Sequence, residues 1–426
     1  MSPIGRRGLL TGAAAAGFLG AAGAAEGSPR PTAPDRILSA RDFGAVGDGV
    51  TDDTAALQKA FEATLTPKIA TMVVIPPGLY RVTKTIRVVT KRPLGGNITH
   101  RTGILAHGAR LVSVIDNGSP VIEIESQATL RFYLIEGLQI NGSGKDGHGL
   151  LITCQKRGTY FYNFCLRDLV IEGCGGDGCR LIGNVFEGQI INGYFRENKG
   201  CGATFGHGKE NTVLSAVHVF GCVFGANGVH GVTMIDGAQD VGFYGCYFLL
   251  NQRYGLSAAT GCTLLSHCGF ENNHMRAKDF DHGDAGLRLM VGGTLIGCTA
   301  YSIQNQTLLV RAFVTNRLVM IGCTASGGGA AKRVRLGVVQ GKGGAGVSVI
   351  GCQGGIERKG AIEMVEFDGE ESGLRIGGRW DSEKLAWLGE HVLWVDSAGV
   401  LRIKKGKPKA DDDGNAVGNT RNDRKT

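Results

Sequence analysis

The chain has 426 residues, of which 70 are Gly and only 10 are Pro, and its formal net charge is +8. Gly is about twice as frequent as in an average protein, but it follows no Gly-X-Y period, which excludes collagen. The excess positive charge lies in Arg6, Arg7 and residues 402–426. No basic stripe interleaved with aromatic residues indicates a nucleic-acid partner.

Residues 1–25 predict an export signal. Arg6 and Arg7 precede a short apolar run over residues 11–23, and residues 22–24 (AGA) offer a cleavage site. The run is too short and too rich in Ala and Gly for a membrane span. The paired arginines resemble a twin-arginine signal, which exports folded proteins, and an ordinary secretory leader is the alternative. Both signals predict a secreted or periplasmic protein that is not held in a membrane.

Residues 26–70 predict a linker, which contains Pro31 and Pro34, followed by an N-terminal cap. Residues 42–61 read as a strand, a Gly/Asp turn and a helix that begins after Asp52 or Asp53. The apolar positions of this helix recur at helical spacing and give it one apolar face; they are Ala56, Leu57, Ala60 and Phe61. Such a helix can cover the open end of a solenoid.

The same region resembles a known family. DFGAVGDGVTDDT at residues 42–54, followed by IPPGLY at residues 75–80, is similar to the start of the pectate-lyase-like superfamily, which includes polysaccharide lyases, rhamnogalacturonase-like hydrolases, alginate epimerases and phage tailspikes. The resemblance implies a right-handed, single-stranded β-helix that handles acidic or complex polysaccharides. The aspartates of the motif are typical of turns and helix caps rather than of catalysts.

Residues 71–365 predict a solenoid because Cys-centred segments recur along them. The gaps from Cys222 through the cysteines at 246, 268, 298, 323 and 352 are 24, 22, 30, 25 and 29 residues, and Cys174 lies about two repeats earlier. A period in the twenties is typical of solenoids. The segments are rich in β-branched, aromatic and Gly residues, which favours short strands joined by turns.

A second signal repeats in step with the cysteines. Each repeat has a Gly-rich turn before a short apolar strand, as at residues 147–152, 229–235, 253–257 and 284–289. Two strands at fixed places in every repeat predict an all-β parallel β-helix, with neighbouring strands about 4.8 Å apart. The cysteines then fill one inward position per coil as free, buried thiols. A zinc cluster or a disulfide framework is the alternative, but no Cys-x-x-Cys pair supports it.

The connection between Cys268 and Cys298 concentrates acidic and basic side chains. Asp281 and Asp284 could form a carboxylate pair or hold Ca²⁺, which is the only cofactor that the sequence indicates. His282 could transfer a proton, and Arg276 and Lys278 could neutralise a substrate carboxylate. A solvated surface loop is the alternative interpretation of this segment.

Neighbouring coils add candidates on polar turns. The catalytic candidates are Lys209, Glu210, Asp236 and Arg253, and the substrate-binding candidates are Tyr254 and His230. Residues one repeat apart become neighbours in a β-helix, so Glu210, Asp236 and the 271–284 segment could share one groove. A register error of one residue would reverse the face to which each side chain points. His230 is also typical of a turn residue.

The sequence therefore predicts an exported polysaccharide-degrading enzyme, most of all a lyase that cleaves a uronate polymer by β-elimination. A glycoside hydrolase or glycosyl-transferring enzyme with paired carboxylates is one alternative. A non-catalytic glycan-binding or tailspike-like adhesin is the other, because one fold hosts many functions. The expected partner is a polysaccharide rather than a nucleic acid or a membrane, and the chain is expected to be a monomer or a homotrimer.

The repeat fades after Cys352. Residues 390–404 alternate like a hairpin with its turn at residues 397–399, so residues 366–404 are predicted to form a short C-terminal β cap. Residues 405–426 are rich first in Lys and then in Asp, and they are predicted to be disordered.

Overall fold

The computed structural model describes residues 36–66, 69–93, 101–206, 208, 212–260, 263–273, 285–302, 306–314, 317–327, 333–341, 345–353, 355–359, 362–368, 373–375, 386–388, 391–395, 401–405, 409 and 413–416. The predicted export signal lies outside this set. Strands dominate the described residues, which also form the 3-10 helix η1 (Ala40–Phe43) and the α-helix α1 (Thr54–Ala63). No helix in the described part of the chain has the length and apolar character needed to cross a bilayer.

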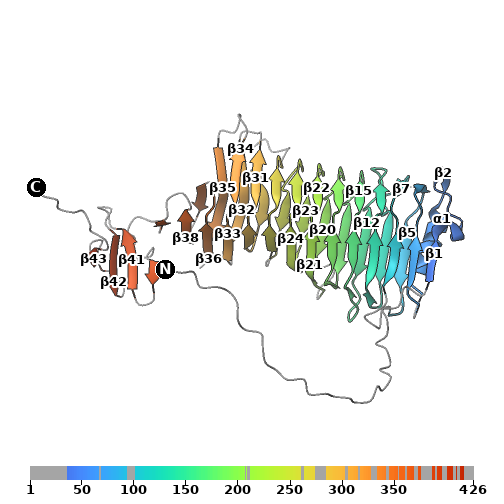
Figure 1. Cartoon of the computed structure of the whole chain (residues 1–426), viewed down its shortest axis with the longest axis horizontal. Coiled ribbons are helices and arrows are strands. Elements are labelled where there is room, and N and C mark those ends of the chain that lie inside the picture. Colours follow the sequence, from blue (N-terminus) through green and yellow to red (C-terminus); the bar gives the residue numbers. More distant parts are fainter. Residues whose placement is uncertain are drawn as a thin grey trace, which may run out of the picture. The chain divides into compact units, whose positions relative to one another are not determined.

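The chain winds repeatedly through three sheets, which we call A, B and C in the order in which each coil enters them (Figure 1). In the described part of these three sheets, neighbouring coils pair in parallel, and β39 is the one strand that joins antiparallel. Sheet A contains β1 (Arg36–Ser39), β3 (Thr71–Val74), β6 (Thr102–Leu105), β9 (Leu130–Arg131), β10 (Tyr133–Glu136), β13 (Phe161–Tyr162), β14 (Cys165–Arg167), β17 (Val185–Phe186), β18 (Gln189–Ile191), β21 (Leu214–Phe220), β24 (Ala238–Tyr244), β27 (Thr263–Ser266), β30 (Gly293–Ile296), β33 (Arg317–Ile321), β36 (Ala345–Ile350), β38 (Ile362–Asp368) and β39 (Gly373–Arg375).

Sheets B and C are built in the same way. Sheet B contains β2 (Asp48–Asp52), β4 (Gly78–Val82), β7 (Ala109–Ser113), β11 (Gln139–Asn141), β15 (Val170–Glu172), β19 (Tyr194–Arg196), β22 (Val223–Gly225), β25 (Tyr247–Leu249), β28 (Gly269–Glu271), β31 (Thr299–Ser302) and β34 (Thr324–Gly327). Sheet C contains β5 (Ile86–Thr90), β8 (Ile122–Ser126), β12 (Leu150–Cys154), β16 (Cys179–Gly183), β20 (Ala203–Gly206), β23 (Val232–Met234), β26 (Leu256–Ala258), β29 (Ala285–Leu289), β32 (Gln306–Val314), β35 (Arg333–Gly341) and β37 (Gly355–Lys359). The predicted parallel β-helix is thus confirmed.

Each complete coil has three strand positions, whereas the sequence predicted two. The Cys-centred segment, taken as one strand, is bent between sheets A and B by a residue with left-handed backbone angles. Gly221 and Gly245 occupy this place with φ of 58° and 60°, and Asn192 and His267 adopt it with φ of 52° and 53°. Glycine carries no steric penalty in this conformation, so the bend is easily made and divides one apolar run into two strands.

The residue after this bend forms a ladder along the interior. Its places are filled by Leu138, Leu169 and Gly193 and then by the cysteines at 222, 246, 268, 298, 323 and 352, as successive backbone hydrogen bonds show. Cys174 does not belong to the ladder, although the sequence grouped it there. Its backbone N–H donates to Asn198 Oδ1 over 3.1 Å, which places it in the turn between sheets B and C. Leu169 fills the ladder place in that coil.

All eleven described cysteines are free, and nine are buried, as the sequence predicted. Contact with the preceding thiol and burial raise the pKa values of Cys246 and Cys268 to about 12. The thiolate is the reactive form of cysteine, so protonated and enclosed thiols resist reagents. We expect Ellman's reagent at pH 8 to leave these nine thiols unmodified in the folded protein and to modify them after denaturation. Rapid reaction of all of them in the folded protein would contradict the ladder.

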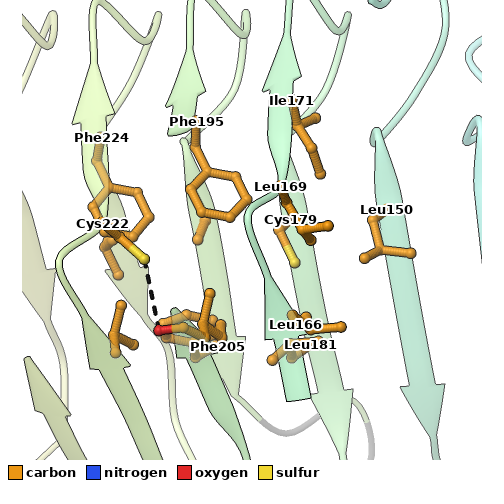
Figure 2. Close-up of a cluster of buried hydrophobic side chains, with 14 of the residues drawn as sticks. Leu150, Leu166, Leu169, Ile171, Cys179, Leu181, Phe195, Phe205, Cys222 and Phe224 are labelled. Carbon is orange, nitrogen blue, oxygen red and sulfur yellow. Dashed lines mark hydrogen bonds between the residues drawn. The ribbon is translucent and has the colours of Figure 1, made fainter. Parts of the chain in front are cut away.

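Aromatic rings fill the interior behind sheet B. Phe195 and Phe224 stack on successive coils with ring centroids 5.2 Å apart, and both point inward with Cys222 beside them (Figure 2). Phe224, Phe248 and Phe270 continue the stack at 5.3 and 4.8 Å. The in-register pairing of sheet B places one ring per coil at the same height, so the rings form a continuous column.

A column of asparagines follows the phenylalanines in the turns between sheets B and C. Its members are Asn198, Asn227, Asn251 and Asn273, all buried. The amide of each joins the next by side-chain hydrogen bonds of 3.1, 3.0 and 2.8 Å. The turns must bury polar backbone groups, and these amides provide their hydrogen-bond partners.

Helix α1 packs beside the first coils, near β3 and β5, and buries Leu57, Ala60 and Phe61 there. Asp53 stands before the helix but does not cap it, since its carboxylate accepts from the N–H groups of Val46 and Gly47 at 2.6 and 3.1 Å. Asp52 accepts from the N–H of Thr54 at 3.1 Å instead. The motif aspartates therefore act in turns and at the helix start.

The C-terminal region forms a separate antiparallel sheet of four strands, β40 (Ala386–Leu388), β41 (His391–Val395), β42 (Leu401–Lys405) and β43 (Asn415–Ala416). The pairing of β41 with β42 matches the hairpin predicted from the alternation. The predicted disorder of residues 405–426 is wrong for residues 413–416. Lys404 Nζ binds the Asp413 carboxylate at 2.5 and 2.6 Å, and Arg402 pairs with Ala416, so the acidic segment returns to the basic strand.

Candidate functional site

The outer face of sheet A combines polar, charged and aromatic side chains in three rows that run along the β-helix. The row next to sheet B contains Glu136, Arg167, Ile191, Phe220, Tyr244 and Ser266. The middle row contains Leu134, Cys165, Gln189, His218 and Gly242. The third row contains Arg131, Tyr162, Phe186, Ser215 and Gln239. We call these rows the sheet A face.

A row of non-glycine residues with left-handed backbone angles separates the middle row from the third. Asn163, Glu187, Ala216 and Asp240 adopt φ of 54°, 52°, 54° and 49°. Such angles are rare for residues with side chains and concentrate at functional sites. Asn163 Nδ2 donates to Glu187 Oε2 over 2.8 Å. Glu187 and Asp240 lie two strands apart, about 10 Å at the usual strand spacing.

A cavity of about 290 Å³ opens on the sheet A face between β10 and β18. Its lining includes Arg101, Asn163, Cys165, Arg167, Glu187 and Gln189. Burial raises the pKa of the Cys165 thiol, while Arg167 and Arg101 act in the opposite direction. The thiol is thus protonated and serves as a small, half-buried wall of the cavity rather than as a nucleophile.

Arg167 borders the cavity and is held by Glu136 on the adjacent strand. The two form a direct ion pair, and the hydrogen bond from Arg167 to Glu136 raises the pKa of the guanidinium. His107 Nε2 reaches the other oxygen of Glu136 at 3.0 Å. Glu136 therefore orients one arginine and one imidazole, and Arg167 offers its remaining N–H groups to an anionic ligand.

His218 lies at the centre of the sheet A face among aromatic rings. The stacked rings of Phe220 and Tyr244 have centroids 4.9 Å apart, and the His218 ring lies 6.3 and 6.0 Å from them. A Cβ at Gly242 would come within 2.7 Å of the Tyr244 hydroxyl, so the absent side chain leaves room for the phenol beside His218. Imidazole and phenol are both groups that transfer protons.

The Nδ1 atom of His218 is buried and finds no hydrogen-bond partner among the described residues. Buried polar groups are nearly always paired, so an unpaired one points to a functional constraint. Nε2 is then the nitrogen available to a ligand. The sequence did not single out His218, because a lone His between Val217 and Val219 reads as part of a strand. The alternation that turns it outward is the only signal that points to it.

The predicted site residues that the structure describes lie in two different places. Asp236 follows β23 in the turn that enters sheet A, and it is exposed. His230, Arg253 and Tyr254 lie in turns between sheets B and C, at the opposite ends of the sheet C strands. Lys209, Glu210, Arg276, Lys278, Asp281, His282 and Asp284 lie outside the described residues.

His230 and Tyr254 are brought together. The Tyr254 N–H donates to His230 Nδ1 over 3.2 Å, and the two rings stack with centroids 5.5 Å apart. Arg288 lies 5.9 Å from the centre of the Tyr254 ring. His148, three coils earlier, accepts from the N–H of Asp177 over 2.9 Å in the same way, and burial lowers the pKa of its imidazole. Both histidines thus fix turns, which for His230 agrees with the turn interpretation of the sequence.

A second cavity, of about 490 Å³, lies on sheet C and is lined by Glu123, Glu125, Thr153, Gln155 and Lys156 among others. Arg87 forms ion pairs with both glutamates and so partly neutralises their charge. In the described part of the chain, no three His, Cys, Asp or Glu side chains are grouped closely enough to hold a metal ion. The predicted Ca²⁺ ligands Asp281 and Asp284 lie outside that part.

Two family models match parts of the chain. Residues 37–134 match "Rhamnogalacturonase A/epimerase, pectate lyase-like", and residues 321–419 match "Capsule depolymerase". No curated protein matches the sequence. The first match includes the motif at residues 42–54 and confirms the resemblance that the sequence predicted.

Solved structures are similar in fold. The enzymatically active domain of tailspike protein 2 of bacteriophage CBA120 superposes with a TM-score of 0.52 at 12% identity, covering 74% of this chain and 47% of that one. The Agl-KA catalytic domain gives 0.50 at 12% identity, covering 79% and 69%. ORF18 of Geobacillus virus E2 gives 0.49 at 19% identity, covering 88% and 69%. With residues 37–134 matching the family model, the chain has the right-handed parallel β-helix fold of pectate-lyase-like proteins.

Proposed function

We propose that this protein is a polysaccharide-degrading enzyme whose chemistry takes place on the sheet A face. The pectate-lyase-like and capsule depolymerase models that match its two ends support a carbohydrate substrate. The observation that carries the proposal is the unpaired Nδ1 of His218 beside the Tyr244 phenol. Buried polar atoms are usually paired, and on this face the unpaired nitrogen belongs to a group that can transfer protons.

The reaction that suits these side chains best is β-elimination in a uronate polymer. The Arg167 guanidinium neutralises the uronate carboxylate, which acidifies the proton on C5. The imidazole of His218 takes that proton, a double bond forms between C4 and C5, and the C4–O bond breaks. The Tyr244 hydroxyl gives a proton to the departing oxygen, and solvent restores both groups. The resulting chain end is an unsaturated uronate.

The proposal also covers the candidate residues that the sequence places in polar turns. Asp236, Lys209 and Glu210 belong to the connections that lead from sheet C into sheet A, between β23 and β24 and between β20 and β21. Of these, we assign Asp236, which is exposed, to the border of the sheet A face. Asp281, His282, Asp284, Arg276 and Lys278 belong to the connection between β28 and β29, as Arg253 belongs to the one between β25 and β26. For Lys209, Glu210 and these residues we propose the roles that the sequence indicates: proton transfer or a carboxylate pair for the catalytic candidates, and substrate binding for Arg276 and Lys278.

Hydrolysis is the second candidate reaction, and one observation favours it. Glu187 and Asp240 flank Ala216 two strands apart, and this spacing of about 10 Å is close to the upper end of the range for inverting hydrolases. In that reaction one carboxyl group would protonate the glycosidic oxygen and the other would activate water. A binder without turnover is the third possibility.

One assay separates the three possibilities. The full chain is incubated with polygalacturonate, alginate and rhamnogalacturonan, with and without Ca²⁺, and ultraviolet absorbance and reducing ends are followed together. We expect both signals to rise in step, because each elimination creates one double bond and one reducing end. Reducing ends without absorbance would replace the lyase by a hydrolase. Retention on the polymers without either signal would leave only a binding protein.

Activity on an extracellular polymer requires export, for which residues 1–25 provide the proposed signal, to the periplasm or the medium. Expression with and without these residues, followed by fractionation, tests this part. Mature protein in the cytoplasm from both chains would contradict it. Light scattering of the exported protein would distinguish a monomer from a homotrimer.

A further inference from the structure

The outer face of sheet B carries a second set of aromatic side chains, separate from the sheet A face. Tyr194, Tyr247 and Tyr301 are 38%, 46% and 40% exposed. They stand on β19, β25 and β31, which are every second strand of sheet B. Tyr194 and Tyr247 share one row and therefore lie about 10 Å apart along the β-helix, which is comparable with the length of a disaccharide unit in an extended polysaccharide, whereas Tyr301 lies in the neighbouring row beside Glu271.

The rings are held in place by their neighbours. A Cβ at Gly269 would come within 2.5 Å of Cε2 of Tyr247, so the Tyr247 ring lies across the next strand, over the glycine. Arg196 Cζ lies 5.7 Å from the centre of the Tyr194 ring. Tyr194 and Tyr247 occupy one row, with Val223 between them. Small or flat residues between the rings leave the row open to a ligand that runs along it.

The small area of this surface argues against a globular partner bound to sheet B alone. From β19 to β28 each strand of sheet B has three residues, so the strip is about 10 Å wide and, over the five strands to β31, about 24 Å long. The resulting area of about 240 Å² is far below the roughly 800 Å² per partner of a stable protein interface. The inner strands of the sheet pair on both sides, so no free backbone groups remain for an added peptide strand.

We propose that this strip, which we call the tyrosine strip, is a non-catalytic binding surface for an extended polysaccharide. Tyrosine rings stack on the apolar faces of sugar rings, and a narrow strip with periodic rings fits a chain-like ligand. The charged residues in the neighbouring row are Glu172, Arg196 and Glu271. Arg196 is already paired with Glu197. Two carboxylates lie beside the rings. They can accept hydrogen bonds from sugar hydroxyls and would repel the carboxylates of uronates, so the strip suits neutral sugar units better.

Affinity gel electrophoresis of the full chain tests the tyrosine strip. The gels contain dextran, a mixed-linkage β-glucan, galactan or polygalacturonate. In the His218→Asn background, where turnover is removed, we expect at least one neutral polysaccharide to retard the protein, whereas retardation by polygalacturonate reports binding to the sheet A face and should not depend on the two tyrosines. The double variant Tyr194→Ala/Tyr247→Ala should lose affinity by roughly three- to tenfold for each ring removed.

Two control variants test whether the loss of affinity comes from the loss of the tyrosine rings. Tyr194→Phe/Tyr247→Phe retains the rings and should bind like the wild type. Gly269→Ala displaces the Tyr247 ring without removing it and should weaken binding. Retardation that is equal in the wild type and the double Ala variant, or absent with every neutral polysaccharide, would overturn the proposal. Neither result bears on catalysis at the sheet A face, because unsaturated product from polygalacturonate is measured separately.

Discussion

Replacing His218 by Asn is expected to lower kcat on the cleaved polysaccharide by about 10²–10⁴-fold, the usual contribution of a positioned proton-transfer group. The half-buried imidazole lies at the centre of the sheet A face with its Nδ1 enclosed, and we assign Nε2 to the substrate. Asn fills much of the same space but cannot accept the C5 proton. The effect should therefore fall on kcat more than on KM, since Arg167 and the aromatic rows still bind substrate.

His267→Asn is the matched control. His267 is exposed at the bend between sheets A and B, with φ of 53°, and its Nδ1 lies 2.8 Å from Ser266 Oγ. Asn is tolerated in this backbone conformation, so the control loses an imidazole without strain. We expect its turnover to match the wild type. Equal activity of the His218 variant and the wild type, with both folded by circular dichroism, would remove the catalytic role of the sheet A face.

The position of Tyr244 offers an independent check of the same mechanism. Tyr244→Phe removes the proposed proton donor and keeps the stacked ring at 4.9 Å from Phe220. Gly242→Ala keeps the phenol but pushes it aside, because the new Cβ would meet the ring within 2.9 Å. Both variants should slow cleavage of the native polymer. A substrate with an activated leaving group needs no proton donor, so on it the loss in Tyr244→Phe should be much smaller.

The coil repeat of the β-helix could be predicted from the sequence. A Gly precedes each of the sheet C strands β12, β16, β20, β23 and β26, and the cysteines from 222 onward keep one place in successive coils, so these repeats predict parallel pairing. The division of each coil into three strands was hidden, because a bend needs only one residue with positive φ. Asn192 and His267 make that bend as well as Gly221 does, and their side chains carry no signal of it.

The candidate site was harder to predict from the sequence, for a different reason. Sequence reasoning favoured segments with many charges, whereas the sheet A face is assembled from one outward residue per strand on several coils. Arg167, His218 and Tyr244 stand on β14, β21 and β24, and the register places them on the same outer face, with β18 between Arg167 and the other two. An error of one residue in the predicted register would have placed all three side chains in the core instead of on the outer face. Cys174 shows this sensitivity, since its turn resembles the cysteine ladder but lies in a different corner of the coil.

The largest loss of stability is expected from the asparagine column, in the variant Asn227→Ala. The Asn227 Oδ1 atom accepts from the backbone N–H and the side chain of Asn198 at 3.2 and 3.1 Å, and its Nδ2 donates to the Phe195 carbonyl at 3.1 Å. Truncation leaves the buried Asn198 N–H without a partner and removes hydrogen bonds from the Asn198 amide, the Phe195 carbonyl and Asn251 Oδ1; an unpaired buried group costs about 1–3 kcal/mol. We expect the free energy of unfolding to fall by about 3–6 kcal/mol, measured by denaturant unfolding followed by circular dichroism.

Asn227→Asp gives this prediction a pH dependence that simple loss of packing would not. A carboxylate at this place still accepts from Asn198, but it faces the Phe195 carbonyl and Asn251 Oδ1, to which Asn227 Nδ2 now donates at 3.1 and 3.0 Å. Burial and these oxygens would raise the pKa of the introduced carboxyl above its unfolded value of about 3.9. The folded state would then bind the proton more tightly than the unfolded state, so the destabilisation should be smallest below about pH 4 and grow as the pH rises through the raised pKa. Asn117→Asp, at an exposed turn, should show no such trend. A pH-independent loss at Asn227 would mean that the column stabilises the coils by shape alone rather than by its hydrogen bonds.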